Sequence, residues 1–215
     1  LLGDTVEYAV QEARTGTAGA VESAALMLQG QFERVVVIGG DAPLVAEDSV
    51  RRLIDGHIQD SRQMSILSGI AQVSQGLGRI SRDLGSQQNV LGIVEANHDT
   101  GRTGEPVEIN SGVYCFQADW LWENLGQVGA GKSQERYLTD LAAIAAGKGD
   151  AVAAVVVDDP DEVMGINTRV ELAFLEDIQR RRIRERWMLE GVTIMDPSSV
   201  MIDDAVVIGQ DTVLL

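Results

Sequence analysis

The sequence has little that would link it to an oxidising compartment, a membrane or a nucleic acid. Its single cysteine, Cys115, cannot form an internal disulfide, which fits a reducing cytoplasm. No hydrophobic run reaches the length of a membrane span, so we expect no membrane partner. Only 17 basic residues stand against 33 acidic ones, and a net charge of −16 argues against nucleic-acid binding, because a basic surface supplies most of that affinity.

Aromatic residues are also scarce. They make up 4% of the chain while apolar residues make up 45%, so the core must be built from Val, Leu, Ile and Ala, as is typical of α/β proteins. A length of 215 residues is enough for one α/β domain, or for a domain and part of a second. The chain opens with Leu1 and not with methionine, and we expect it to be cut from something longer.

The apolar run at residues 35–38 organises the rest of the chain. Four consecutive β-branched residues predict a strand covered on both faces, as in a parallel sheet. Gly39 and Gly40 then remove Cβ where backbone must approach a ligand, and Asp41 is expected in the crevice at the carboxyl end of the strand. A carboxylate there is placed to hold Mg²⁺ against a phosphate. The alternative is an ordinary loop aspartate.

The segment before this strand predicts a βαβ unit. Residues 6–11 have the pattern of a short strand, and Thr17 is expected to cap a helix over 18–28. A right-handed crossover would then place the loop at 14–19 on the same sheet edge as Asp41. Its backbone N–H groups would face a nucleobase or an anion, or the loop serves only to cap the helix.

Downstream, the spacing of apolar residues predicts further elements. A helix is expected to begin at Asp48, and residues 76–95 are expected to contain a β-hairpin, followed by an exposed loop at 97–107. The other expected strands are 65–71, 108–116 and 152–157, and the other expected helices are 119–125, 141–146 and 168–190.

Residues 126–133 match the Walker A pattern letter for letter. A loop of that type follows a buried strand and opens a helix, whereas residues 120–125 have helical spacing. We therefore favour a glycine-rich loop without phosphate-binding function over an ATPase motif.

The C-terminal part differs from the rest of the chain in composition and in the spacing of its apolar residues. The long helix is highly charged, which is typical of a connecting arm, and Ile202, Ile208 and Leu214 recur every six residues, as in a parallel β-helix. These three residues should point to one side. The predicted domains are an incomplete α/β domain at 1–166, a connecting helix at 167–190 and first hexapeptide repeats at 191–215.

Seven segments, in order, resemble the landmarks of one family, the bifunctional N-acetylglucosamine-1-phosphate uridylyltransferase and glucosamine-1-phosphate acetyltransferase family. The stretch at 191–197 resembles that family's entry into a hexapeptide repeat. The seven segments are 16–18, 40–44, 76–80, 93–95, 108–112, 135–140 and 165–169.

The resemblance implies a Rossmann-like α/β fold with a mostly parallel sheet that lacks its first βαβ unit, a long helix and the start of a left-handed parallel β-helix. It implies transfer of a uridylyl group from UTP to N-acetylglucosamine 1-phosphate, with release of pyrophosphate, for cell-envelope precursor synthesis. The full-length family member would be a homotrimer joined through the β-helix domain. Catalysis would rest on positioning and charge neutralisation.

The resemblance also implies site residues. Mg²⁺ is the expected cofactor, held by Asp41 and Asn167, although Asn167 alternatively only caps the long helix. The expected nucleotide-binding residues are Gln11, Gly16, Thr17 and Gly40. The expected sugar-binding residues are Gly78, Glu95, Asn110, Glu135, Tyr137 and Thr139.

Two alternatives stay open. Arg14, Thr15, Gly39 and Met164 differ from the residues the family usually has there, which leaves open a transferase for glucose 1-phosphate with dTTP or UTP. The sequence also contains no counterpart of the family's glycine-rich triphosphate-binding loop with its Arg and Lys. A catalytically inactive nucleotide-binding or assembly fragment is therefore the second alternative, and the chain is expected to turn over poorly beside its full-length form.

Overall fold

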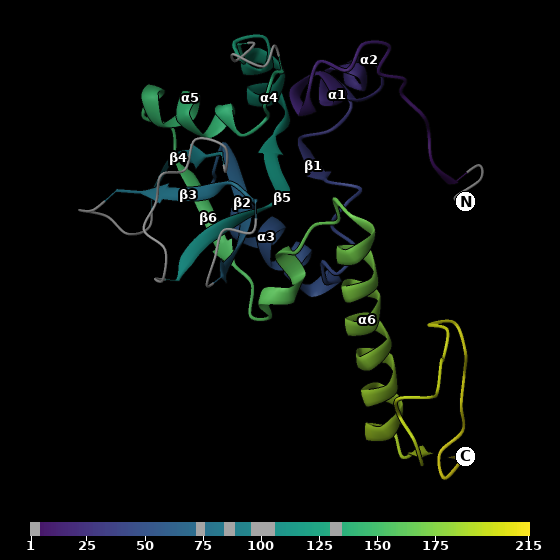
Figure 1. Cartoon of the computed structure of the whole chain (residues 1–215). Coiled ribbons are helices and arrows are strands. Elements are labelled where there is room, and N and C mark those ends of the chain that lie inside the picture. The colour runs from purple at the N-terminus through teal and green to yellow at the C-terminus, as the bar shows by residue number, and fades with distance from the viewer. Residues whose placement is uncertain (1–4, 72–75, 84–88, 96–105, 130–134) are drawn as a thin grey trace. The chain divides into compact units, whose positions relative to one another are not determined.

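The structure is a computed structural model that describes residues 5–71, 76–83, 89–95, 106–129 and 135–215. The chain divides into two compact units, Leu1–Val163 and Met164–Leu215, which are taken in turn. Figure 1 gives the labels of their helices and strands.

The first unit is built on a mixed six-stranded sheet with the order β4-β3-β5-β2-β6, in which β1 also pairs with β5. Among the described strands, β1, β2, β3 and β6 run one way and β4 and β5 run the other way. The prediction of a sheet in which most strands run in the same direction is thus confirmed. The order of neighbours is a separate matter: β5 lies among the co-directional strands, and β2 and β6 are the one parallel pair among the described residues of this sheet. The strands are β1 (Arg34–Ile38), β2 (Met64–Ala71), β3 (Arg79–Arg82), β4 (Val90–Val94), β5 (Val107–Gln117) and β6 (Val152–Val156).

Helices cover both faces of this sheet (Figure 1). Side chains alternate across the strands, so Tyr114 and Phe116 of β5 pack in one core cluster and Val113 and Cys115 pack in the other. The first cluster includes residues of α1 (Thr17–Ser23), α4 (Ala118–Leu125) and α5 (Asp140–Lys148). The second includes residues of α3 (Glu47–Gln59) and of the 3₁₀ turn η3 (Pro160–Val163). The short helix α2 (Ala25–Leu28) follows α1.

Two predictions near the start of the chain are wrong. Residues 6–11 form no strand in the described chain, and Tyr8 and Val10 are exposed, so the predicted βαβ unit is absent. The predicted helix over 18–28 breaks at Ala24 into α1 and α2. An apolar alternation does not make a strand unless another strand lies beside it to accept its backbone hydrogen bonds.

The prediction that the run at 35–38 is covered on both faces is also wrong. Val35 is buried on the α1 side, while 36% of Val36 and 50% of Ile38 stay exposed on the other side. The reason is that α3 packs mainly against β2 and β5 and leaves that face of β1 open.

Most other elements lie where the sequence places them. The predicted hairpin forms from β3 and β4, and the predicted helices at 119–125 and 141–146 correspond to α4 and α5. The helix expected from Asp48 has Ala46 as its N-cap. Residues 96–105 of the expected loop and residues 130–133 of the Walker-like segment lie outside the described residues, but the element before that segment is the helix α4, as predicted.

The second unit consists of the long helix α6 (Arg169–Leu189) and an extended C-terminal stretch with β7 (Thr193–Ile194) and β8 (Val213–Leu214). Thr168 and Glu171 form a capping box at the start of α6. The strands β7 and β8 pair in parallel. Ile202, Ile208 and Leu214 pack against the same cluster, which contains Ile183 and Trp187 of α6. The three apolar residues with six-residue spacing therefore face one side, as predicted.

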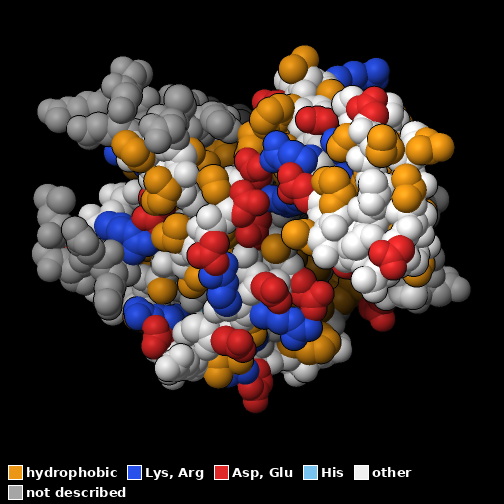
Figure 2. Space-filling model, turned by 90° about the horizontal axis from the view of Figure 1, so that it is seen from below, with side chains coloured by type: hydrophobic (Ala, Val, Ile, Leu, Met, Phe, Trp, Pro, Cys, Tyr) orange, Lys and Arg blue, Asp and Glu red, His pale blue; other side chains and the backbone are white. Residues whose placement is uncertain are grey.

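Charge is mixed on the surface shown in Figure 2, where basic side chains lie among acidic ones and form no continuous basic area over its described residues. This agrees with the net charge of −16. In the described part of the chain, none of the helices combines the length and the apolar character that crossing a bilayer requires.

Candidate functional site

The edge of β5 that faces away from β2 is shared by two strands. β1 pairs with residues 113–117 of β5, and β3 begins at Arg79 opposite Ile109. Both strands run antiparallel to β5, so the carboxyl end of β1 and the amino end of β3 meet across residues 110–112. The predicted site residues of the first unit gather around this break in the sheet.

Asp41 lies just beyond the end of β1. The Gly39 N–H donates to the Gly112 carbonyl at 3.3 Å, which ties the start of the Asp41 loop to β5. A Cβ added at Gly39 would lie 2.6 Å from Asp41 Oδ1, so the missing side chain leaves that carboxylate oxygen accessible. The carboxylate itself is exposed, and a Cβ at Gly40 would meet no atom within 4 Å. This open carboxylate fits a divalent cation that takes most of its ligands from phosphate and water.

Asn110 joins the two sides of the break. Its backbone N–H donates to the Gly78 carbonyl at 2.8 Å, and its Oδ1 accepts from the Gly112 N–H at 3.1 Å. Its Nδ2 donates to the Tyr114 hydroxyl oxygen at 2.7 Å. Gly112 has φ 78°, a left-handed conformation that favours glycine and that lets β5 bend at this point.

Glu95 and Thr139 lie on the other side of Gly78. Thr139 Oγ1 donates to Glu95 Oε1 at 2.5 Å, and a Cβ added at Gly78 would lie 2.7 Å from Ile93 Cγ2 and 3.7 Å from Glu95 Oε2. Gly78 therefore lets the chain pass close to the hairpin and keeps the Glu95 carboxylate open on that side.

Tyr114 is a buried phenol at the centre of this arrangement. Burial raises its pKa above the ordinary value of a tyrosine, the hydrogen bond from Asn110 opposes that shift, and the negative charges of Glu95 and Asp41 add to it. The hydroxyl thus stays protonated at neutral pH. Glu95 and Asp41 lie far apart in the sequence, and both are close enough to raise the pKa of the Tyr114 hydroxyl.

The loop before α1 is bound to the segment before α5. The Leu138 N–H donates to Thr17 Oγ1 at 2.9 Å, and the Ala18 N–H donates to the Arg136 carbonyl at 3.0 Å. Gly16 has φ 96°, and a Cβ there would lie 2.5 Å from the Arg136 carbonyl oxygen. Only glycine suits this approach. The predicted nucleotide-binding and sugar-binding segments are therefore joined directly.

Gln11 and Tyr137 extend the site at its two ends. Gln11 Nε2 donates to the Gly16 carbonyl at 3.1 Å and to Thr15 Oγ1 at 3.4 Å, so both of its N–H groups are used inside the loop. The Tyr137 hydroxyl donates to Glu135 Oε2 at 2.7 Å.

The predicted partner of Asp41 belongs to the second unit. The backbone N–H of Asn167 donates to Glu171 Oε2 at 2.7 Å, and this bond, with those from Thr168, lowers the pKa of Glu171. The residue that caps α6 is Thr168, so the alternative in which Asn167 is the cap is wrong. The metal-binding role of Asn167 stays a prediction. The described residues contain no cluster of three or more His, Cys, Asp or Glu side chains that could hold a metal.

The sequence did not point to three residues that organise the site. Gly112, Tyr114 and Arg136 hold Asn110, the buried phenol and the α1 loop in place. Gly112 and Arg136 lie inside the quoted motifs at 108–112 and 135–140, so they could have been found as neighbours of polar site residues. Tyr114 reads as an ordinary strand residue.

Comparison with known proteins identifies the family of the chain. A profile of the family described as nucleotidyl transferase matches residues 2–180. The chain belongs to the nucleotidyl transferase family. The resemblance stated from the motifs is thereby confirmed, because proteins named bifunctional protein GlmU match along nearly the whole chain.

These nucleotidyl transferase relatives are close over a limited part of their length. The identity is 41% over 99% of the chain for the protein of an Exiguobacterium species, 40% over 100% for Caldanaerobacter subterraneus and 38% over 99% for Enterococcus faecalis. The chain spans about half the length of the curated relatives it matches, 46–47% of these three.

A solved structure shares the fold. It is a CMP:2-keto-3-deoxy-manno-octonic acid synthetase complexed with CTP, with a TM-score of 0.62 over 84% of this chain and 74% of that one. The sequence identity is 16%, so the likeness is one of fold alone.

Proposed function

We propose that this nucleotidyl transferase chain forms the site that transfers a uridylyl group from UTP to N-acetylglucosamine 1-phosphate and releases pyrophosphate. The observation that carries the proposal is two series of hydrogen bonds that lie on the two sides of Gly78. The first joins Thr17 to Leu138, and the next residue, Thr139, to Glu95. The second runs from the Gly78 carbonyl through Asn110 and Gly112 to the start of the Asp41 loop. Within the first unit, the base-binding candidates, the sugar-binding candidates and Asp41 are thus held by neighbouring hydrogen bonds.

The base would be selected at the α1 loop. Because both N–H groups of Gln11 donate within the loop, its amide oxygen remains as an acceptor that faces an N–H group of the ligand. Uracil and thymine carry an N3–H donor, whereas N3 of cytosine is an acceptor. Placed opposite N3 of the base, the Gln11 oxygen would favour uracil or thymine over cytosine.

The sugar 1-phosphate would lie between Glu95, Asn110 and Thr139, where fixed polar groups reject a ligand that cannot satisfy them. Glu135 and Tyr137 would close the same side. Asp41, with Asn167, would hold Mg²⁺, which when bound supplies positive charge against the phosphates. In-line attack by the sugar phosphate oxygen on the α-phosphorus needs no protein nucleophile, so these residues act by positioning.

The test is pyrophosphate release by the full gene product with four substrate pairs. UTP with N-acetylglucosamine 1-phosphate should give the highest kcat/KM, and CTP in place of UTP should lower it at least about a hundredfold, as expected for a mispaired buried hydrogen-bonding site. Chelation with EDTA should abolish turnover and added Mg²⁺ should restore it. Higher kcat/KM with dTTP or UTP and glucose 1-phosphate would replace the substrate assignment, and no pyrophosphate from any pair would contradict the enzyme proposal.

A further inference from the structure

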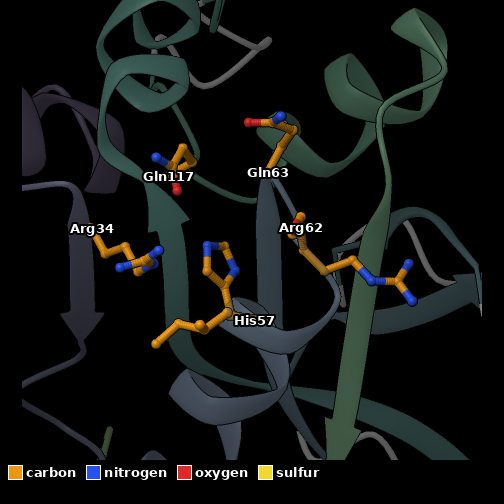
Figure 3. A pocket seen from close by; sticks show the side chains of 7 residues that line it. Arg34, His57, Arg62, Gln63 and Gln117 are labelled. Carbon is orange, nitrogen blue, oxygen red and sulfur yellow. The ribbon is translucent and has the colours of Figure 1, made fainter.

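A cavity of about 320 Å³ lies at the opposite end of β1 from Asp41. It occupies the corner where β1 and β2 begin and β5 ends, beside the last turn of α3. Its lining residues are Arg34, His57, Ile58, Ser61, Arg62, Gln63 and Gln117 (Figure 3). None of these residues is among the candidate residues of the transferase site.

Backbone hydrogen bonds fix the walls of this cavity. The Gln117 N–H donates to the Gln63 carbonyl at 3.0 Å, and the Arg62 N–H donates to the His57 carbonyl at 3.1 Å. Strand pairing places Arg34 opposite Gln117. The side chains that line the cavity therefore project from a rigid frame, as a preformed ligand site requires.

His57 is a buried polar group with one unused nitrogen. The residue is 1% exposed, its Nδ1 lies 2.9 Å from Ser65 Oγ, and its Nε2 is buried without a partner among the described residues. Burial, and then the charge of Arg34, lowers its pKa to about 4, so the ring is neutral at pH 7. In the tautomer in which the Ser65 hydroxyl donates to Nδ1, the ring proton lies on Nε2 and makes that atom a donor, and the proposal below takes this tautomer.

Arg34 presents a second unused donor. Its Nε is buried and has no partner among the described residues, although one terminal nitrogen lies 3.1 Å from the exposed Glu33 carboxylate. Figure 3 shows the Arg34 guanidinium turned toward the His57 ring, with Gln63 and Gln117 above them, while the Arg62 guanidinium turns away. Two buried nitrogens, one of them on a cationic side chain, thus belong to residues that line the cavity and have no hydrogen-bond partner among the described residues.

We propose that this cavity binds a small oxyanion, a phosphate or a carboxylate, between the Arg34 guanidinium and the Nε2–H of His57. An oxyanion supplies the several acceptors that these groups lack, and a guanidinium matches the geometry of a carboxylate or phosphate. The site is separate from the transferase site, because β1 runs from Arg34 at the cavity to Ile38 beside the Asp41 loop. The proposal therefore does not depend on which reaction the transferase site performs.

Histidine NMR tests the proposal directly, because the chain contains two histidines, His57 and His98. Long-range ¹H–¹⁵N spectra of the 215-residue chain are recorded during titration with sodium phosphate, sodium acetate or sodium chloride at constant ionic strength. The His98→Gln variant assigns the two sets of signals. We expect saturable shifts of the His57 ring signals with phosphate or acetate and none with chloride. Tighter binding of phosphate would identify a phosphorylated ligand, and tighter binding of acetate would identify a carboxylate ligand.

Arg34→Gln should weaken this binding about tenfold to a hundredfold, because it removes a charge-assisted hydrogen bond. The matched control is Arg51→Gln, which removes the same charge from an exposed arginine on α3 that pairs with Glu47 and does not line the cavity. Thermal melting checks that both variants are folded. If Arg34→Gln does not fold, the titration of the wild-type chain decides the outcome. Shifts that grow without saturation, or equal affinities for wild type and a folded Arg34→Gln variant, would overturn the proposal.

Discussion

The two ends of β1 differ in how their polar groups are used. Beyond its carboxyl end, Asn110, Thr139 and Glu95 bond to one another or to backbone, and Asp41 stays exposed. At its amino end, His57 Nε2 and Arg34 Nε are buried without partners among the described residues. The first end has paired polar groups beside an exposed carboxylate, and the transferase site is proposed there, whereas the second has a cavity of about 320 Å³ beside buried nitrogens without partners.

This difference shows that polar side chains bonded to one another and buried donors without acceptors are two separate signs of function. Side chains that bond to one another hold a shape before the ligand arrives, which lowers the entropy cost of binding. Buried donors without acceptors destabilise the empty protein, and a ligand that satisfies them gains that free energy on binding. The following variants test the comparison, starting with the largest expected effect.

Asp41→Asn should lower kcat/KM for pyrophosphate formation by about 10²–10³-fold, because it removes the carboxylate that would hold Mg²⁺, and the bound ion would supply positive charge against the phosphates. The matched control is Asp158→Asn, another exposed aspartate just after a strand that runs in the same direction, which pairs with Arg52 at 2.7 Å. Steady-state kinetics should show the control within about twofold of wild type. Equal losses in the two variants would remove Asp41 from the site.

Gly16→Ala should destabilise the first unit by about 3 kcal/mol, because alanine at positive φ is strained and its Cβ would displace the Arg136 carbonyl. Gly30→Ala is the control, since Gly30 also has positive φ but a Cβ there meets no atom within 4 Å. It should cost about 1 kcal/mol. Urea unfolding measures both, and the same loss for both would mean that the close approach of the α1 loop to Arg136 contributes no stability.

Thr139→Val should raise the KM for the sugar 1-phosphate about tenfold with little change in kcat, because Glu95 loses the donor that orients it. Thr139→Ser keeps the hydroxyl and should restore the wild-type KM. If serine fails to rescue while valine keeps the fold, as judged by thermal melting, the methyl group of Thr139 and not its hydrogen bond is what matters.

The smallest effect concerns the amino end of β1. The pKa of His57 in the folded protein is about 4, below the ordinary histidine value of 6.5, so His57 contributes stability that is complete above pH 6.5 and is lost as the pH falls toward 4. Arg34→Gln should raise the pKa of His57 partway toward 6.5, because it removes the charge and leaves the burial. An NMR pH titration of the ring signals measures this. A pKa that stays at about 4 in the variant would show that burial alone sets it.

The sequence predicted one end of β1 far better than the other. Gly16, Gly78, Glu95 and Asn110 lie in short motifs, and the order of those motifs along the chain was enough to name them as one site. Arg34, His57 and Gln117 lie in no motif, and each reads as an ordinary helix or strand residue. Their convergence depends on the pairing of β1 with β5 and on the packing of α3, which no local pattern contains.

Local patterns determined the elements whose signals are local: the helices α4, α5 and α6, the β3–β4 hairpin and the glycines that allow close approach at the site. The tertiary structure decided the rest. It left residues 6–11 without strand pairing, exposed one face of β1, and placed β5 between strands that run the other way. The physical reason is that side-chain periodicity fixes which faces of an element are apolar. The neighbours of a strand, and the buried polar atoms that lack hydrogen-bond partners, depend instead on contacts between residues far apart in the chain.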